Sequence, residues 1–349
     1  MANGSKATIL VTGGSGYFGE CLIRHIQNTQ DVWIRNFDLV PNSPDIKNIE
    51  YIQGDIRDVA AVEAAVKGCQ YVLHCVAQVP LARDKEKFLS VNVEGTRNLL
   101  EACRTQRVLK LVALSSSAIF GIPSKNPVDD SVAPRPLEDY GRAKWQAEQL
   151  CHDYMRQGLD VTLIRPRTIM GHGRLGIFQI LFSWIAEGRH VYVLGSGNNR
   201  YQFVHADDLA GACIKAMVRP GVAVYNIGAE TFGSMRQTLE ALTAYAGTGS
   251  RVKSLPMGPA VWGMKLMSTL HLGPLAPYHY LMYGRDMYFD LTRARQELGW
   301  QPRWSNIEMF KQSYDWFLAH RHEITADGSV SAHRSAVKLG LLRLLKWWS

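Results

Sequence analysis

The sequence predicts an α/β fold in which a doubly wound parallel sheet is followed by a smaller C-terminal α/β region. Short apolar runs alternate with amphipathic stretches through the first half of the 349 residues, which is typical of βαβ units. A glycine-rich turn over 13–19 follows the first apolar run and opens the first amphipathic stretch. The run 109–115 is largely apolar, as expected of a strand that is covered on both faces.

Apolar runs predict six strands of this sheet, over 7–11, 32–37, 50–53, 71–75, 109–115 and 161–165. Amphipathic periodicity predicts helices over 16–27, 59–66 and 86–105, and a further helix that begins near Tyr140. After residue 166 we expect helices over 177–187, 207–218, 235–246, 293–298 and 305–320, and short strands over 202–205 and 224–227. The stretch 255–283 is rich in Met, Pro, His and Tyr, and we expect it to cap a site rather than to extend the sheet.

Composition and charge restrict the functional classes. The net charge of +8 comes without Lys/Arg runs interleaved with aromatic residues, so we expect no nucleic-acid partner. The six cysteines form no C-x-x-C pair, which favours reduced thiols, a cytoplasmic location and no metal site. No long apolar segment precedes the glycines, so we expect no signal peptide, and no later apolar stretch is uninterrupted enough to span a membrane.

A dinucleotide site is predicted at the turn that holds Gly13, Gly16 and Gly19. Glycine permits the tight turn, the close approach of a pyrophosphate and tight helix–strand packing, while the helix N-terminus presents free N–H groups to the phosphates. Asp38 ends the second strand 19 residues after Gly19, close to the spacing of a ribose-binding acid. Its carboxylate would repel a 2′-phosphate, which favours NAD over NADP, although Arg35 favours the opposite.

This site defines the expected domains. A Rossmann-type NAD-binding domain is predicted over 1–166, with parts of 202–228 returning to it. A mainly substrate-binding cap region is predicted over 167–322, followed by a linker over 323–333 and a basic amphipathic tail over 334–349.

Tyr140 and Lys144 are four residues apart, so they share one face of the expected helix. A nearby ammonium, together with the cationic nicotinamide of NAD⁺, favours the phenolate and makes the tyrosine usable as a general base. The serines 115–117 follow the buried strand, where a hydroxyl can hydrogen-bond a reacting oxygen. These residues predict alcohol–ketone redox chemistry.

Together the motifs resemble the extended short-chain dehydrogenase/reductase superfamily over most of residues 7–320. Other similar segments are GDIRD (54–58), HCVA (74–77), NVEGT (92–96), RP (165–166), FVHADD (203–208), YNIG (225–228) and LGWQP (298–302). The resemblance implies NAD as the cofactor. It adds residues of the glycine turn and of two later segments to the expected cofactor contacts: Tyr17, Phe18, Asp55, Ile56, Val76 and Ala77.

The resemblance also implies a mechanism. Tyr140 takes the hydroxyl proton while the substrate carbon gives a hydride to NAD⁺, and Lys144 binds the nicotinamide ribose. Ser116, five residues before Gly121, steadies the oxygen, with Ser117 as the alternative. An epimerase would return the hydride to the opposite face of the ketone, whereas a dehydrogenase would release both products.

The preferred prediction is an NAD-dependent sugar 4-epimerase that acts, through a transient 4-keto intermediate, on a nucleotide- or polyprenyl-diphosphate-linked sugar. Ser117 and Ala118 stand where dehydratases carry an acid, which disfavours dehydration. The Arg-Asp pair that nucleotide-sugar epimerases carry before the FVH strand is missing. Beyond the sixth strand, where these enzymes often carry an asparagine, this chain has Arg167 and Thr168. The substrate contacts predicted from these positions are Gln78, Ser117, Thr168, Arg200 and Tyr201.

Two alternatives stay open. The segment GSGNN (195–199) is similar to that of 3β-hydroxysteroid dehydrogenases, which favours an NAD-dependent dehydrogenase on a hydrophobic alcohol, whereas YGRAKWQAE (140–148) is similar to epimerases of polyprenyl-linked sugars. A non-catalytic NAD-binding protein is the third reading, against which the intact Tyr140/Lys144 pair argues. A homodimer is expected.

The tail over 334–349 carries four cations and no acid, and one helical face of it holds Val337, Leu341, Leu344, Leu345 and Trp348, whereas Leu339 and Leu342 interrupt the polar face. A short, basic, Trp-ended amphipathic helix favours peripheral contact with the inner face of an anionic membrane. Packing of this helix on the body or on a dimer partner is the alternative.

Overall fold

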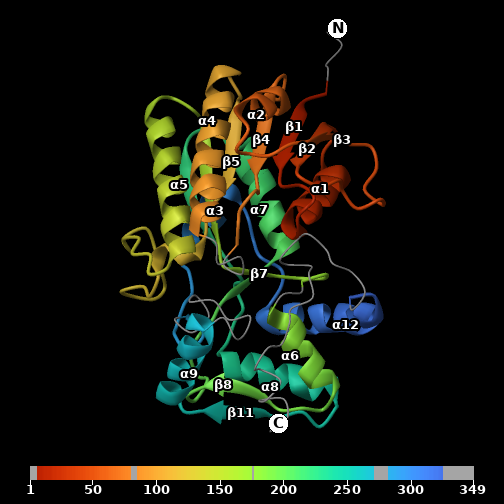
Figure 1. The fold of residues 1–349 in the computed structure, drawn as a ribbon, viewed down its shortest axis with the longest axis vertical. Coiled ribbons are helices and arrows are strands. Elements are labelled where there is room, and N and C mark those ends of the chain that lie inside the picture. Colours follow the sequence, from red (N-terminus) through yellow and green to blue (C-terminus); the bar gives the residue numbers. More distant parts are fainter. Residues whose placement is uncertain (1–5, 80–84, 175–176, 271–281, 325–349) are drawn as a thin grey trace.

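The computed structural model describes residues 6–79, 85–174, 177–270 and 282–324, and it has the predicted α/β architecture (Figure 1). Seven parallel strands form one sheet in the order β10-β6-β5-β4-β1-β2-β3. They are β1 (Thr8–Thr12), β2 (Trp33–Asp38), β3 (Glu50–Gln53), β4 (Tyr71–His74), β5 (Lys110–Leu114), β6 (Val161–Pro166) and β10 (Ala223–Ile227). The predicted fold class is therefore confirmed.

The strand order reverses at β1, which pairs with β2 on one side and with β4 on the other. From β1 the chain builds outward to β2 and β3, then crosses back to β4, β5 and β6. In a doubly wound sheet the loops at the carboxyl ends of these strands separate at the reversal and leave a crevice. The fold therefore places the ligand site beside the glycine turn that follows β1.

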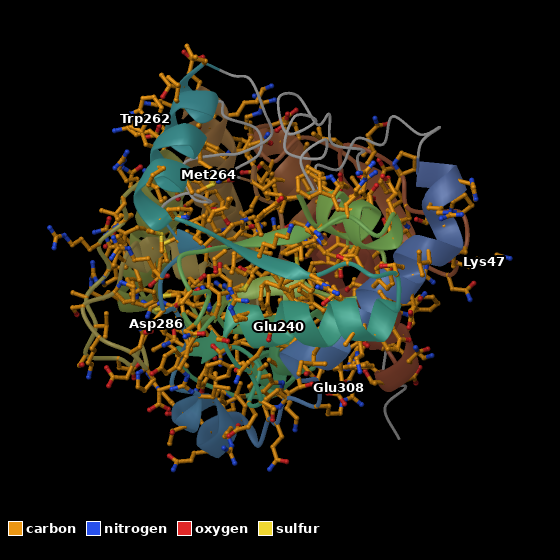
Figure 2. All side chains as sticks on the ribbon, turned by 90° about the horizontal axis from the view of Figure 1, so that it is seen from below. Lys47, Glu240, Trp262, Met264, Asp286 and Glu308 are labelled. Carbon is orange, nitrogen blue, oxygen red and sulfur yellow. The ribbon has the colours of Figure 1, made fainter. Side chains whose placement is uncertain are left out.

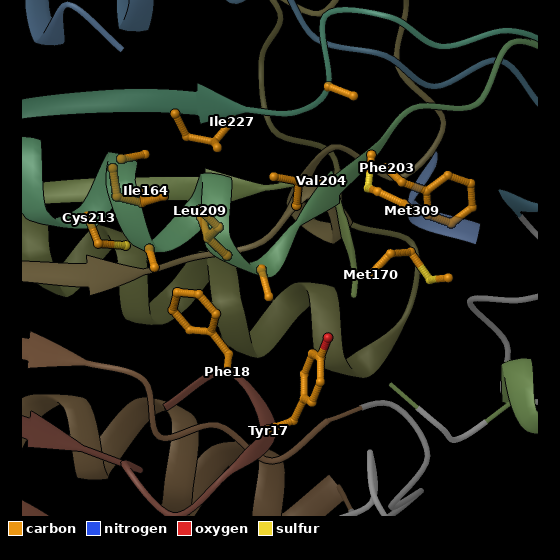
Figure 3. Packing of buried hydrophobic residues seen from close by; sticks show 14 of the residues in the cluster. Tyr17, Phe18, Ile164, Met170, Phe203, Val204, Leu209, Cys213, Ile227 and Met309 are labelled. Carbon is orange, nitrogen blue, oxygen red and sulfur yellow. The ribbon is translucent and has the colours of Figure 1, made fainter. Parts of the chain in front are cut away.

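Helices cover both faces of the sheet. Helices α1 (Tyr17–Thr29) and α7 (Ala206–Val218) pack together on one face, with α2 (Val59–Val66), α4 (Gly95–Thr105) and α5 (Asp139–Arg156) on the other. Alternation along β1 serves both layers, because Ile9 and Val11 enter the first core and Leu10 the second. Figure 3 shows Phe18 and Leu209 within the first core.

The predicted helix over 86–105 contains a π-helical segment. It is divided into α3 (Lys85–Leu89), η2 (Ser90–Glu94) and α4. The buried Asn92 in η2 accepts a hydrogen bond from Gln78 N at 2.7 Å and donates one to Gln78 O at 3.0 Å. The π-helical turn thus holds the loop after β4 through Asn92. Apolar periodicity alone did not predict this turn.

The remaining elements form a smaller α/β region. Two-stranded parallel sheets join β7 (Thr168–Met170) to β9 (Phe203–His205) and β8 (Val191–Leu194) to β11 (Val252–Leu255). The helices are α6 (Ile177–Ala186), α8 (Met235–Ala246), α9 (Met257–Thr269), α11 (Thr292–Leu298) and α12 (Asn306–Ile324), with η3 (Ser117–Phe120) after β5. Strands β7, β8 and β11 were not predicted; they lie after β6, where strands and helices no longer alternate regularly along the chain. In the expected cap over 255–283, Leu255 ends β11 and α9 follows, while 271–281 lie outside the described residues.

A buried ion pair joins α5 to two strands of the sheet. Arg165 in β6 donates from Nε to both carboxylate oxygens of Glu148 in α5, at 3.1 and 3.2 Å. Ser115, at the end of β5, donates to the same carboxylate at 2.6 Å. Burial opposes ionisation of Glu148, but hydrogen bonds from His152, Arg165 and Ser115 outweigh it and lower its pKa from 4.5 to about 2.

The variant Glu148→Gln should lower the free energy of unfolding by about 3 kcal/mol at pH 7, because Arg165 stays buried without its counter-ion. A depressed pKa stabilises the fold above the unfolded-state value, and this contribution is lost as the pH falls through the folded-state value. The difference between wild type and variant should therefore shrink as the pH falls from about 4.5 toward 2, as measured by urea unfolding. Glu101→Gln, which removes an exposed acid, is the control and should cost about 1 kcal/mol or less. A difference that stays constant with pH would contradict this account.

Candidate active site

A cavity of about 810 Å³ lies at the carboxyl ends of the strands, where the strand order reverses. Its walls come from the glycine turn, the loops after β2, β3, β4, β5 and β6, and the start of α5. The structure brings together there all the predicted catalytic and cofactor residues and three of the predicted substrate contacts: Gly13, Gly16, Tyr17, Phe18, Gly19, Asp38, Asp55, Ile56, Val76, Ala77, Gln78, Ser116, Ser117, Tyr140, Lys144 and Thr168.

The three glycines of the turn meet different constraints. Gly13 has a φ of +74°, and a Cβ there would lie 2.8 Å from Val76 N. At Gly19 a Cβ would lie 2.0 Å from Gly13 O, so only glycine lets α1 pack on the turn. At Gly16 a Cβ would meet only Gly13 O, at 3.3 Å. The fold therefore restricts Gly16 less than Gly13 and Gly19, which fits a position where a pyrophosphate approaches the backbone.

The carboxylate of Asp38 closes the same end of the cavity. It accepts hydrogen bonds from Ser15 N at 3.0 Å and from Val40 N at 3.4 Å, and burial raises the pKa of this group. Arg35 does not compete for this position, because it pairs with Glu50 and donates to backbone carbonyl oxygens at the end of α2. A ribose diol fits beside Asp38, whereas the Asp38 carboxylate would repel a 2′-phosphate. Arg57, which also lines the cavity, is paired with Asp55.

Helix α5 presents Tyr140 and Lys144 to the cavity from its first turns. Its N-terminus is capped by Glu138, whose carboxylate accepts from Tyr140 N at 2.8 Å and from Gly141 N at 2.6 Å. Gly141 permits close approach to the segment after β5, because a Cβ would lie 2.6 Å from Ala118 O. Lys144 donates from Nζ to Leu114 O at 2.5 Å, and burial lowers the pKa of this ammonium from 10.5 to about 8.

The three serines after β5 have different partners. Ser115 is bound to Glu148, and Ser117 accepts from Arg167 Nη1 at 2.8 Å. Ser116 is half-buried and accepts from Ala118 N at 3.1 Å, which leaves its hydroxyl proton able to point into the cavity. This arrangement favours Ser116 as the serine that contacts a reacting oxygen.

Two predicted substrate residues do not line the cavity. The guanidinium of Arg200 stacks on Tyr288 at 4.3 Å and on Phe232 at 5.0 Å. Tyr201 is fully buried, with its hydroxyl 3.2 Å from Thr168 Oγ1.

Arg167, Arg174 and Tyr283 are among the lining residues that were not predicted from the sequence. For Arg167 the available signal was its place directly before Thr168. Within the described ranges, no group of His, Cys, Asp and Glu side chains is arranged to hold a metal ion. None of the helices described is long and apolar enough to cross a membrane.

The sequence pattern of the NAD dependent epimerase/dehydratase family matches residues 9–228, which span the glycine turn, Tyr140/Lys144 and β10. The chain belongs to this family. NAD is accordingly its cofactor, as the glycines and Asp38 predicted. Bound there, the dinucleotide would be held by the turn after β1, Asp38 and the loops after β3 and β4.

Relatives of this chain carry several activities. It is 50% identical to y4nG of Sinorhizobium fredii, an uncharacterized protein, over 97% of this chain and 86% of that protein. It is 27% identical to a 3 beta-hydroxysteroid dehydrogenase/Delta 5-->4-isomerase of Mycobacterium tuberculosis, over 95% of each.

Solved structures share the fold. UDP-glucose 4-epimerase of Thermotoga maritima with UDP-glucose superposes with a TM-score of 0.74 at 23% identity, over 90% of this chain and 99% of the other. MoeE5 in complex with UDP-glucuronic acid and NAD superposes with a TM-score of 0.71 at 25% identity, over the same shares of the two chains.

The variant Gly16→Ala should fold normally but bind NAD about tenfold more weakly or worse, because the added methyl group occupies space that the pyrophosphate needs. Isothermal titration with NAD and thermal unfolding without it would measure the two effects. Gly211→Ala is the matched control, since its Cβ would have only His25 Nε2 within reach, at 4.0 Å. Unchanged NAD affinity in Gly16→Ala would contradict this placement of the phosphates.

Proposed function

We propose that this protein is an NAD-dependent 4-epimerase of a sugar linked to a nucleotide or to polyprenyl diphosphate, acting through a transient 4-keto intermediate. The observation that carries this proposal is the joint placement of Tyr140, Lys144 and Ser116 in the cavity that also holds the glycine turn and Asp38. The fold shared with UDP-glucose 4-epimerase supports the substrate class.

Tyr140, Ser116 and Lys144 have separate roles in the proposed reaction. Tyr140 takes the proton of the sugar hydroxyl, and Ser116 hydrogen-bonds the same oxygen as it becomes a carbonyl. Lys144 lies one turn along α5 from Tyr140 and supplies positive charge beside the phenol, which favours the phenolate. When bound at the glycine turn and Asp38, NAD would supply reversible hydride transfer, which an epimerase needs in both directions and a dehydrogenase in one.

The variant Tyr140→Phe should lose at least about 100-fold in turnover, because the general base is removed, while its affinity for NAD stays within about twofold of wild type. Turnover is measured by the conversion of UDP-glucose or of a polyprenyl-diphosphate sugar, and affinity by titration with NAD. Phe88→Leu, which alters only the ring packed 6.0 Å from Tyr140, is the control and should retain most activity. Loss of NAD binding in Tyr140→Phe would make Tyr140 a structural residue.

The alternative function is a 3β-hydroxysteroid-type dehydrogenase, which the relative in Mycobacterium tuberculosis supports. The two reactions differ in their electron balance, because an epimerase regenerates its NAD⁺ whereas a dehydrogenase accumulates one NADH per turnover. Stoichiometric NADH absorbance with a secondary alcohol would favour the dehydrogenase. A homodimer stays a prediction under either function.

A polyprenyl-linked substrate would suit an enzyme that binds a membrane surface. The tail over 334–349 lies outside the described residues, but α9 offers an independent surface. Trp262 is 68% exposed, and Leu266 and Leu270 follow at helical spacing with 43% and 54% exposure. Figure 2 shows Trp262 and Met264 on α9 at the periphery of the molecule. Between Glu240 and Asp286 the sequence has four cations and no acid. An exposed apolar helix within a basic stretch of sequence suits an anionic membrane.

Removing this contact should weaken binding to anionic vesicles. We expect the full chain to sediment with phosphatidylglycerol-containing vesicles, and both Trp262→Ser/Leu266→Ser and deletion of 334–349 to weaken this binding by about tenfold each, because apolar side chains no longer enter the interface. Trp33→Ser removes a tryptophan that is 61% exposed on β2 and should have no effect. Unchanged binding in both altered proteins would refute membrane contact through these segments.

A further inference from the structure

Arg167 is a buried cation in the cavity wall. It follows β6 directly, its backbone N–H donates to Ile227 O at 2.9 Å, and the residue is only 1% exposed. Thr168, the next residue in the sequence, and Ser117, its hydrogen-bond partner, line the cavity as well. Arg167 therefore lies at the end of the cavity that holds the catalytic residues, and not at the glycine turn.

The surroundings of this guanidinium are mostly aromatic. Its central carbon lies 4.6 Å from the ring centre of Tyr201 and 5.7 Å from that of Phe289. Nη1 donates to Ser117 Oγ at 2.8 Å, whereas Nε and Nη2 are buried and have no hydrogen-bond partner among the described residues. Among the residues that the structure describes, no carboxylate lies within ion-pair distance of Arg167.

Arg165, two residues earlier, gives the comparison. Its Nε and Nη2 form the edge of the guanidinium that binds Glu148 through two N–H groups. In Arg167 the same edge is the part without a partner. This edge matches the spacing of two oxygens on a carboxylate or a phosphoryl group, and such paired hydrogen bonds to an anion are strong.

An arginine cannot relieve burial by losing its proton, and aromatic faces return only part of the lost hydration. A charge kept beside catalytic groups without a counter-ion is thus explained by an anion that arrives with the ligand. Ser117 reinforces this explanation, because its hydroxyl accepts from Arg167 and can donate to the same anion.

We propose that Arg167 and Ser117 form a subsite for an anionic group of the substrate, a carboxylate or a phosphoryl group, next to the reacting sugar. This inference rests on the proposed function for its substrate, but the subsite itself is defined by the two residues. The carboxylate of a uronic acid and the diphosphate of the carrier are the two sources of such an anion.

The test compares UDP-glucose with UDP-glucuronic acid, which differ by one carboxylate. Binding of each to the NAD complex is measured by isothermal titration for wild type, Arg167→Gln and the control Arg200→Gln, which removes another ring-stacked arginine outside the cavity. If the carboxylate is the anion, wild type should prefer UDP-glucuronic acid by about tenfold and Arg167→Gln should lose that preference. If the diphosphate is the anion, Arg167→Gln should weaken both ligands by about tenfold. Arg200→Gln should change neither.

Two further measurements keep the outcome decisive. If Arg167→Gln fails to fold, Arg167→Lys keeps the charge but lacks the paired N–H groups, and it should still lose several-fold in affinity. Inorganic phosphate, at ionic strength matched with sodium chloride, should raise the unfolding temperature of wild type more than that of the Arg167 variant. If phosphate stabilises wild type more than the variant but neither UDP-sugar binds, the subsite stands and the nucleotide-sugar function is rejected. Affinities and phosphate response equal to wild type in a folded Arg167 variant would overturn the subsite.

Discussion

The buried carboxylate of Glu148 joins the three elements that carry the proposed catalytic residues. It joins the side of α5 to Ser115 at the end of β5 and to Arg165 in β6. Those three elements carry the residues that line the inner end of the cavity: Tyr140 and Lys144 on α5, Ser116 and Ser117 after β5, and Arg167 and Thr168 after β6. A shift of any one element would separate the phenol from the hydroxyls, so the ion pair fixes the relative position of groups that are remote in sequence.

The cofactor half depends on backbone constraints, and for that reason its residues could be read from the sequence. Gly13 needs a positive φ and Gly19 needs the absence of a Cβ, so their identities and spacing follow from the shape of the turn. The position of Asp38 in the site follows from the parallel pairing of β2 with β1, which brings the carboxyl ends of the two strands to the same edge of the sheet. The alternation of apolar runs with amphipathic helices also sufficed for the seven strands of the sheet, whereas β7, β8 and β11 lie after β6, where strands and helices no longer alternate regularly along the chain.

The predicted substrate contacts depend on side chains that distant segments bring together, and the sequence was less informative there. Arg200 was expected to contact substrate because it stands near the position of a phosphate-binding arginine, but its guanidinium lies on the rings of Tyr288 and Phe232. Arg167 was read only as a departure from a family pattern. Its environment combines Ser117, Tyr201 and Phe289, which are 50, 34 and 122 residues away along the chain, so no local pattern could reveal it.

Arg165 and Arg167 show how position within one segment separates structural from functional charge. Both are buried, and Arg165 lies in β6 while Arg167 comes directly after it. The Nε/Nη2 edge of Arg165 is hydrogen-bonded to Glu148, whereas the same edge of Arg167 has no partner among the described residues. A protein that only needed a stable core at residue 167 would gain from an apolar side chain there, since an unpaired buried cation destabilises the fold. The cation is therefore better explained by what the cavity binds than by how the chain folds.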